Sequence, residues 1–415
     1  MITFDRFTLD NGLTVLVHRD RNTPMVAMNV LYKVGSRDEY PDKTGFAHLF
    51  EHLMFGGSLH VPKFDEPLQK AGGDNNAFTN NDFTNYYLTI PKNNLETAFW
   101  LESDRMLSLA FTPKSLEVQR QVVSEEFKQN YLNQPYGDIY LLLKPLAFKH
   151  HPYQWNTIGK DISHIEQATM ADVKSFYAKY YNPDNAILSV AGNVSVDEIE
   201  ELSQKWFGPI ARGNPLERNY PVEPVQHHAR TEIVERYVPQ HAIYKAWVMP
   251  ARTARGFYVT DLISDVLSNG NSSRFYQNLV KKQKLFTELN AFVTGDQDKG
   301  LFIIAGRLTN GVGRRMAEEA IDHEIRNLKE NLVEEREIEK IKNKIEANLV
   351  FGSLSVLNKA MQLGYYEMLG DAALWMQENE KYRSVTREEI RNMARDLLRE
   401  EASNTLFYSA LNIQN

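Results

Sequence analysis

A stretch without regular hydrophobic pattern interrupts the sequence at residues 208–230. It contains most of the local glycine and proline, at Gly208, Pro209, Gly213, Pro215, Pro221 and Pro224. Clusters of Gly and Pro mark loops between regular elements. We therefore predict a linker at 211–227, between a first domain at 1–210 and a second at 228–415. Each of these lengths is sufficient for a hydrophobic core of its own.

The predicted elements follow a similar order on both sides of the linker. In the first half we predict strands at 4–9, 13–18 and 26–32, a helix at 44–55, a strand at 84–90, helices at 95–109 and 114–131, and a strand at 186–191. In the second half we predict strands at 230–238 and 242–249, helices at 256–267 and 273–282, strands at 288–293 and 301–306, and two helical stretches that close the chain. This order predicts an α+β protein made of two similar halves.

The helix predicted at 44–55 carries His48 and His52. Residues four apart lie on one helix face, so both imidazoles can reach one ion, and Glu51 beside that face can touch a metal-bound water. This is the His-x-x-Glu-His arrangement. Two histidines on an exposed helix would need no metal. Apolar neighbours such as Leu49 and Phe50 indicate instead a mostly buried helix, where imidazoles are costly unless paired or coordinated.

The absence of cysteine limits how such a metal site can be completed. Any further ligand must be His, Asp or Glu, and a catalytic zinc usually has three protein ligands and one open position. The helix predicted at 114–131 offers Glu125 and Glu126 next to the apolar Val123 and Phe127. Adjacent carboxylates on a helix are commonly solvated, but one of the two can point inward. Helical pattern alone does not decide which.

Several stretches carry motifs of one known family. They are Val34 to Arg37, Gly45 to Ser58, Asn76 to Thr79, Val122 to Glu126, His151 to Tyr153, Tyr181 to Pro183 and Ala191 to Asn193. Together they resemble the M16 family of pitrilysin-like, inverzincin zinc peptidases, and the resemblance covers nearly the whole chain. The resemblance is weaker in the second half. It implies two homologous halves, each a mostly antiparallel β-sheet covered by α-helices.

The same resemblance implies roles for individual residues. It makes His48, His52 and Glu126 the ligands of a zinc ion (Zn²⁺) and Glu51 the general base of peptide hydrolysis. Members of the family usually carry a second acidic residue seven positions before the ligand glutamate, where this chain has Gln119.

Asn76 and Ala77 match the family's edge strand, whose backbone accepts a peptide substrate as an added strand. Gly72 and Gly73 precede them, so a turn is the alternative interpretation for Asn76.

The second half departs from the family pattern. Family members often carry an Arg and, seven residues later, a Tyr that reaches substrate; Val280 and Thr287 stand at these positions. We therefore hypothesise a two-subunit shell, a heterodimer in which a related M16 subunit supplies the Arg and Tyr; a homodimer is the alternative. The predicted function is a zinc endopeptidase acting on peptides or extended segments in an enclosed chamber. The alternatives are a non-catalytic or scaffold homologue and a dedicated precursor-processing peptidase.

Charge and hydropathy exclude other classes of function. Lys and Arg number 47 against 54 Asp and Glu, a net charge of −7, which argues against a nucleic-acid binder. No run approaches the roughly 18 apolar residues of a membrane span. The first residues lack the features of a signal peptide, and a chain without cysteine suits a reducing compartment. We expect a cytoplasmic location, or a periplasmic one if the start is processed or truncated.

Overall fold

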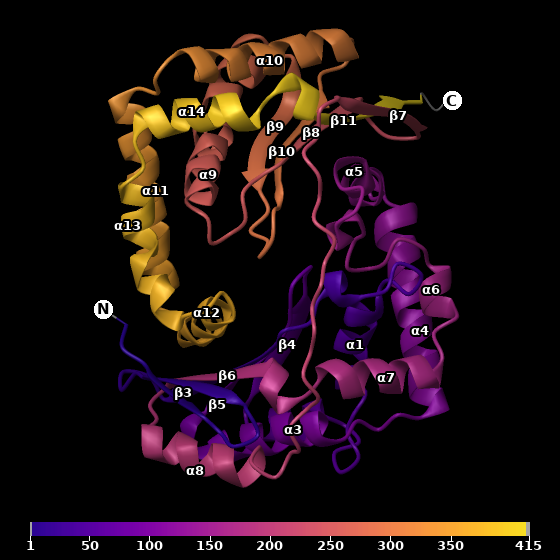
Figure 1. Cartoon of the computed structure of the whole chain (residues 1–415), viewed down its shortest axis with the longest axis vertical. Coiled ribbons are helices and arrows are strands. Elements are labelled where there is room, and N and C mark those ends of the chain that lie inside the picture. The colour runs from indigo at the N-terminus through magenta and orange to yellow at the C-terminus, as the bar shows by residue number, and fades with distance from the viewer. Residues whose placement is uncertain (1, 412–415) are drawn as a thin grey trace. The chain divides into compact units, whose positions relative to one another are not determined.

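Figure 1 shows a computed structural model of the chain, which describes residues 2–411. The chain divides into two compact units. The first holds the residues through Lys128, Trp155–Tyr220 and Leu349–Gln377; the second holds Gln129–Gln154, Pro221–Asn348 and the chain from Glu378 onward. Both units are therefore discontinuous in sequence. The domain boundaries predicted from the sequence, 1–210 and 228–415, follow the repeated order of elements, and they stay a prediction.

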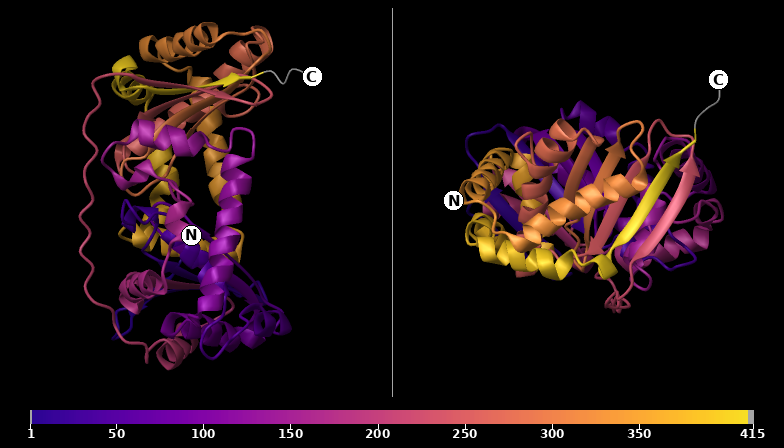
Figure 2. Two further views of the ribbon diagram at one scale, coloured as in Figure 1. Left: turned by 90° about the vertical axis from the view of Figure 1, so that its right-hand side faces the viewer. Right: turned by 90° about the horizontal axis from the view of Figure 1, so that it is seen from above.

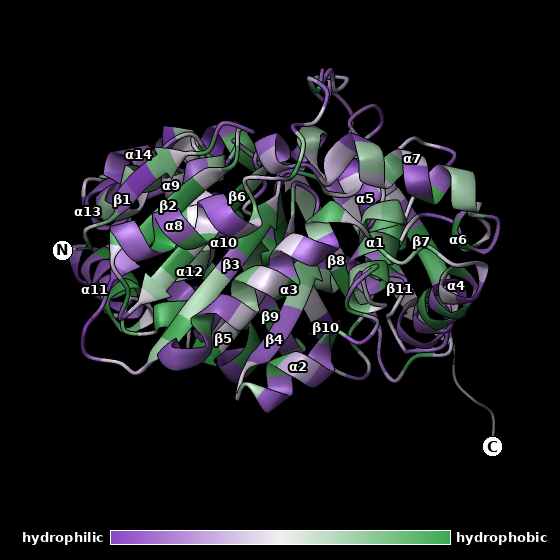
Figure 3. Cartoon of the chain, turned by 90° about the horizontal axis from the view of Figure 1, so that it is seen from below, coloured by the Kyte–Doolittle hydropathy of each residue, from purple (hydrophilic) through white to green (hydrophobic). Residues whose placement is uncertain are grey.

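A six-stranded sheet forms the centre of the first unit, in the order β1-β2-β6-β3-β5-β4. Its strands are β1 (Asp5–Thr8), β2 (Thr14–Arg19), β3 (Met25–Tyr32), β4 (Asp74–Thr79), β5 (Thr84–Pro91) and β6 (Ala186–Gly192). Only β2 and β6 pair in parallel. Helices cover both faces: α12 (Val356–Met368) packs on one, and α3 (Leu95–Leu107) with α8 (Val196–Trp206) on the other, as Figure 1 shows. Figure 3 views the face that α3 and α8 cover. For this reason β3 is buried along almost its whole length.

The second unit contains a five-stranded sheet in the order β7-β11-β8-β10-β9. Its strands are β7 (Arg230–Arg236), β8 (Ala242–Val248), β9 (Phe286–Val293), β10 (Leu301–Leu308) and β11 (Asn404–Ala410). Helix α9 (Arg255–Ser268), with α10 (Arg314–Glu330) and α14 (Arg387–Leu397), closes the larger core on one face, which the right panel of Figure 2 shows. Helix α5 (Ile139–Ala147) packs on the other face.

The two sheets share one topology. In each, the last strand in sequence inserts beside the first long strand as its parallel neighbour, β6 beside β2 and β11 beside β7. The remaining ladder pairs are antiparallel in both sheets. The predicted α+β fold of two similar, mostly antiparallel halves is confirmed.

The remaining helices show where the predicted elements differ from the structure. They are α1 (Phe46–Phe55), α2 (Asp65–Lys70), α4 (Pro113–Phe127), α6 (Ser163–Glu166), α7 (Met170–Tyr180), α11 (Glu335–Gly352) and α13 (Glu378–Arg383). The helix predicted at 114–131 ends at Phe127 and continues as a π-helical turn, Lys128–Leu132. The prediction that two helical stretches close the chain is wrong, because α10 to α14 and strand β11 follow β10. No helix within residues 2–411 combines the length and apolar character that a membrane span requires.

Candidate metal centre

Helix α1 places both histidines of the motif on its less buried side. Phe46, Ala47, Leu49, Phe50, Leu53 and Met54 are all buried in the first unit. The side chains of His48 and His52 are 13% and 25% exposed, so a ligand from outside the core can reach them. The N-cap before the helix is Gly45, whose φ of +92° suits glycine, and a Cβ there would lie 2.8 Å from the carbonyl oxygen of Ile158.

Helix α4 supplies the carboxylate. Its N-terminus is fixed by a capping box between Thr112 and Ser115, and Val123 and Phe127 are buried near its end. Glu126 faces the two histidines, whereas the side chain of Glu125 is 72% exposed and forms an ion pair with Lys128. The structure thus brings Glu126 to the histidines and leaves Glu125 in solvent. Gln119 lies on the same helix and is partly buried.

The three side chains form a compact cluster. Nε2 of His48 and Nε2 of His52 are 3.3 Å apart, and Oε2 of Glu126 lies 3.7 Å from the first and 3.4 Å from the second. Zinc bonds of about 2.0–2.1 Å in a tetrahedral site place neighbouring ligand atoms about 3.3–3.4 Å apart. The donor set and its spacing therefore fit three ligands of one zinc ion. It is the one group of three such residues that could hold a metal within residues 2–411.

The electrostatics of the cluster agree with this fit. Burial, with the neighbouring His52, lowers the pKa of His48 to about 4. A hydrogen bond with His52 lowers the pKa of Glu126. A neutral imidazole and an ionised carboxylate are the protonation states in which these groups bind metal. The Nδ1 atom of His48 is buried without a hydrogen-bond partner among the described residues.

Glu51 lies beside the cluster. Burial raises the pKa of its carboxyl group, and hydrogen bonds from the hydroxyl and the backbone N–H of Thr79 oppose that rise. A carboxylate with a raised pKa is better matched to accepting a proton near neutral pH. Sequence reasoning missed Thr79 as a contact of Glu51, because the two residues meet only through the packing of α1 on β4.

Strand β4 is an edge of its sheet and carries Asn76 and Ala77. It pairs only with β5, so one side of its backbone has no strand neighbour within residues 2–411. The Ala77 N–H donates to Oδ1 of Asn76, at 2.8 Å. Asn76 thus lies in a strand and not in a turn. The free edge that carries Ala77 ends at Thr79, next to Glu51.

A second residue that sequence reasoning missed is Glu39. Its carboxylate is buried and accepts hydrogen bonds from the backbone at the start of α1. Its place directly after Gly35, Ser36, Arg37 and Asp38 suggested only a break in regular structure. The available signal was an acidic residue a few positions before a buried helix that lacks a capping side chain.

Known proteins match this chain along most of its length. Residues 14–153 match the family described as Insulinase (Peptidase family M16), and residues 167–345 match the Peptidase M16 inactive domain. A zinc protease PqqE of Helicobacter pylori is 30% identical over 411 residues, which cover 96% of this chain and 91% of that protein.

Solved structures share the fold. The crystal structure of a protease from Helicobacter pylori superimposes with a TM-score of 0.92 at 28% identity, and covers 99% of this chain and 100% of that one. Pitrilysin superimposes with a TM-score of 0.77 at 17% identity; the match covers all of this chain and 45% of pitrilysin. The pitrilysin likeness is one of fold alone.

Proposed function

Because this chain belongs to the M16 family of peptidases, we propose that it is a zinc-dependent endopeptidase that hydrolyses peptides or extended protein segments. The observation that carries the proposal is the cluster of His48, His52 and Glu126, whose ligand atoms have the spacing of a three-ligand zinc site. Glu51 beside that cluster supplies a base, and the neighbouring edge strand β4 supplies a surface for an extended peptide.

Metal binding, proton transfer and positioning of the base are assigned to different residues. When bound to His48, His52 and Glu126, zinc supplies a lowered water pKa and a Lewis acid for the peptide carbonyl. Glu51 takes the proton of the attacking water and then returns it to the leaving amine. Thr79 holds the Glu51 carboxylate in place through two hydrogen bonds.

Substrate orientation is assigned to β4. An extended peptide that pairs with the free edge of β4 hydrogen bonds to its backbone regardless of the side chains of the peptide. A substrate carbonyl would take over the Ala77 N–H, which Asn76 now occupies. Because β4 ends at Thr79, a peptide aligned along it passes close to Glu51.

The proposal includes an enclosed chamber completed by a second chain, either another copy or a related M16 subunit. Its support is that this chain matches only 45% of the length of pitrilysin, and that Val280 and Thr287 replace the family's Arg and Tyr. Val280 packs against the core of the second unit, and Thr287 is exposed on β9. Full peptidase activity of the purified chain as a homodimer would refute the need for a different subunit.

Metal removal tests the proposal as a whole. We expect one zinc per chain, loss of hydrolysis of an internally quenched peptide after treatment with a chelator, and recovery when zinc is added back. A chain that binds zinc but hydrolyses no peptide would favour the alternative of a scaffold homologue. Hydrolysis of a single precursor and no generic peptide would favour a dedicated processing peptidase.

A further inference from the structure

Glu39 is a buried carboxylate at the start of the helix that carries the histidines. It lies between a short 3₁₀ turn (Ser36–Asp38) and α1, and only 6% of its surface is exposed. Its Oε2 accepts the Gly45 N–H at 2.9 Å, and its Oε1 accepts the Ala47 N–H at 2.8 Å. Both oxygens thus accept backbone N–H groups, which oppose the larger rise that burial causes in the pKa of this carboxyl group.

These two hydrogen bonds replace an ordinary helix cap. The first N–H groups of a helix lack partners within the helix, and a side chain at the N-cap usually satisfies one of them. The N-cap of α1 is Gly45, which has no side chain to do so. Glu39 therefore caps α1 from outside the helix, directly before His48, which is the third helical residue.

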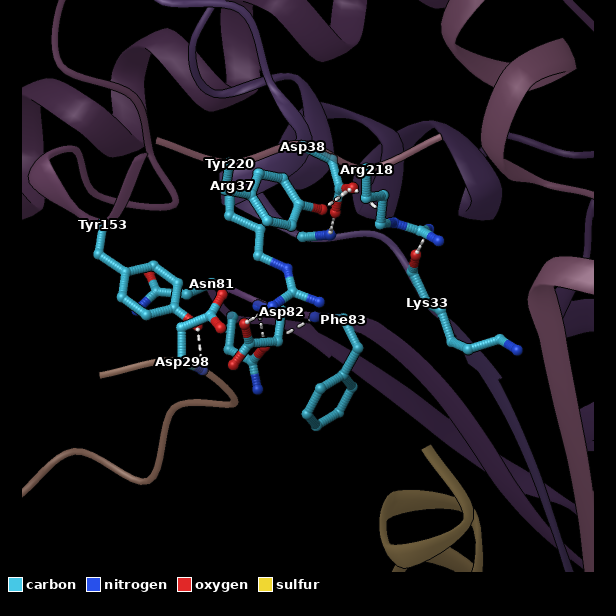
Figure 4. Close-up of polar contacts among 12 residues, drawn as sticks. Lys33, Arg37, Asp38, Asn81, Asp82, Phe83, Tyr153, Arg218, Tyr220 and Asp298 are labelled. Atoms are coloured by element: carbon cyan, nitrogen blue, oxygen red, sulfur yellow. Dashed lines mark hydrogen bonds and ion pairs between the residues drawn. The ribbon is translucent and has the colours of Figure 1, made fainter. Parts of the chain in front are cut away.

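The loop that carries Glu39 is anchored on its other side. The neighbouring Asp38 accepts hydrogen bonds from Nε of Arg218 at 3.1 Å and from the hydroxyl of Tyr220 at 2.7 Å, and Figure 4 shows these contacts. The Arg37 guanidinium forms an ion pair with Asp82 at 2.9 Å. Adjacent charged residues of this loop thus hold it in place, while the Glu39 carboxylate reaches the start of α1.

We propose that Glu39 is a positioning residue of the zinc centre, fixing the first turn of α1 and with it the direction of the His48 imidazole. The inference rests on the proposed function, in which His48, His52 and Glu126 hold zinc.

The second unit offers a matched control. Glu223 is also a buried carboxylate, 7% exposed, and it accepts hydrogen bonds from the backbone N–H groups of Lys149, His150 and His151. It belongs to the other compact unit. Glu223→Gln therefore removes a comparable structural carboxylate without altering the start of α1.

The test compares zinc affinity, by competition with a chromophoric chelator, in wild type, Glu39→Gln and Glu223→Gln. We expect Glu39→Gln to weaken zinc binding about tenfold, the lower range for an outer-shell group. For Glu223→Gln we expect the zinc affinity of wild type. We expect this even if both variants, measured without zinc, lose the same amount of thermal stability. For Glu39→Gln we also expect a lower kcat with an unchanged KM. Equal zinc affinity in all three proteins would overturn the proposal.

Three further variants keep the outcomes distinct. If Glu39→Gln does not fold, Glu39→Asp is compared with Glu223→Asp: weaker zinc binding in the first alone supports the role of Glu39, and equal binding in both overturns it. His48→Ala tests the underlying site. If wild type and His48→Ala bind zinc equally, the proposed function itself fails, whatever the result at Glu39.

Discussion

The Nε2 atom of His52 lies 3.4 Å from the Oε2 atom of Glu126, so that α1 and α4 meet at the candidate metal centre. Both helices belong to the first compact unit. Glu39 fixes the start of α1, and a capping box fixes the start of α4. Because each helix also buries one face in this unit, the cluster depends on the packing of one unit.

The neighbours Glu125 and Glu126 allow a matched test of the third ligand. We predict that Glu126→Gln raises the zinc dissociation constant at least about tenfold, since the loss of a direct ligand should cost no less than the loss of an outer-shell group. Glu125→Gln removes an equal charge one residue away, from a side chain in solvent. Its zinc affinity should equal that of wild type. Chelator competition measures both, and an unchanged affinity in Glu126→Gln would refute the assignment.

The free edge of β4 predicts a backbone role for Ala77. Ala77→Pro removes the N–H that would meet a substrate carbonyl, and proline is tolerated on an edge strand. We predict a fall in kcat/KM of about tenfold for a long quenched peptide, the cost of about one hydrogen bond, with zinc content retained. Ala77→Ser keeps the N–H and should behave as wild type. Equal kcat/KM in the proline and serine variants would exclude peptide pairing at this residue.

Asp265 on α9 predicts a pH dependence of stability. Burial, with the nearby Asp261, raises its pKa to about 6. A raised pKa means that the folded state binds the proton more tightly, so the stability of the wild type falls as the pH rises from about 4 to 6. Asp265→Asn carries no charge and can still accept the hydrogen bond from Asn269.

We therefore predict that Asp265→Asn is more stable than wild type by about 1 kcal/mol above pH 6, a figure reduced from the full shift because the side chain is only partly buried. The difference should vanish below about pH 4. Urea unfolding at several pH values measures it, and a difference independent of pH would contradict the prediction.

Local pattern predicted much of the first sheet and the helix that carries the histidines. The hairpin at Asn11 and Gly12 follows from turn chemistry, since Gly12 adopts a φ of +92°. Helix α1 follows from its apolar face, and it was predicted to within two residues of its start. Repetition of the element order predicted the two similar sheets.

Local pattern does not predict features that depend on contacts between residues far apart in the sequence. Strand β4 is polar and carries little hydrophobic alternation, and only its pairing with β5 excludes a turn at Asn76. Strand β11 inserts between β7 and β8, a position that long-range pairing decides. Glu125 and Glu126 are adjacent and of one type, so only the orientation of α4 against α1 separates them.

The most direct test of the account compares wild type with Glu51→Gln, and measures zinc content and hydrolysis of an internally quenched peptide on the same samples. Glu51 is assigned to proton transfer and not to metal binding, so we predict one zinc per chain in both proteins. We predict that kcat falls by about 10²- to 10⁴-fold in the variant, the usual contribution of a general base. Equal hydrolysis rates in the two zinc-loaded proteins would contradict the account.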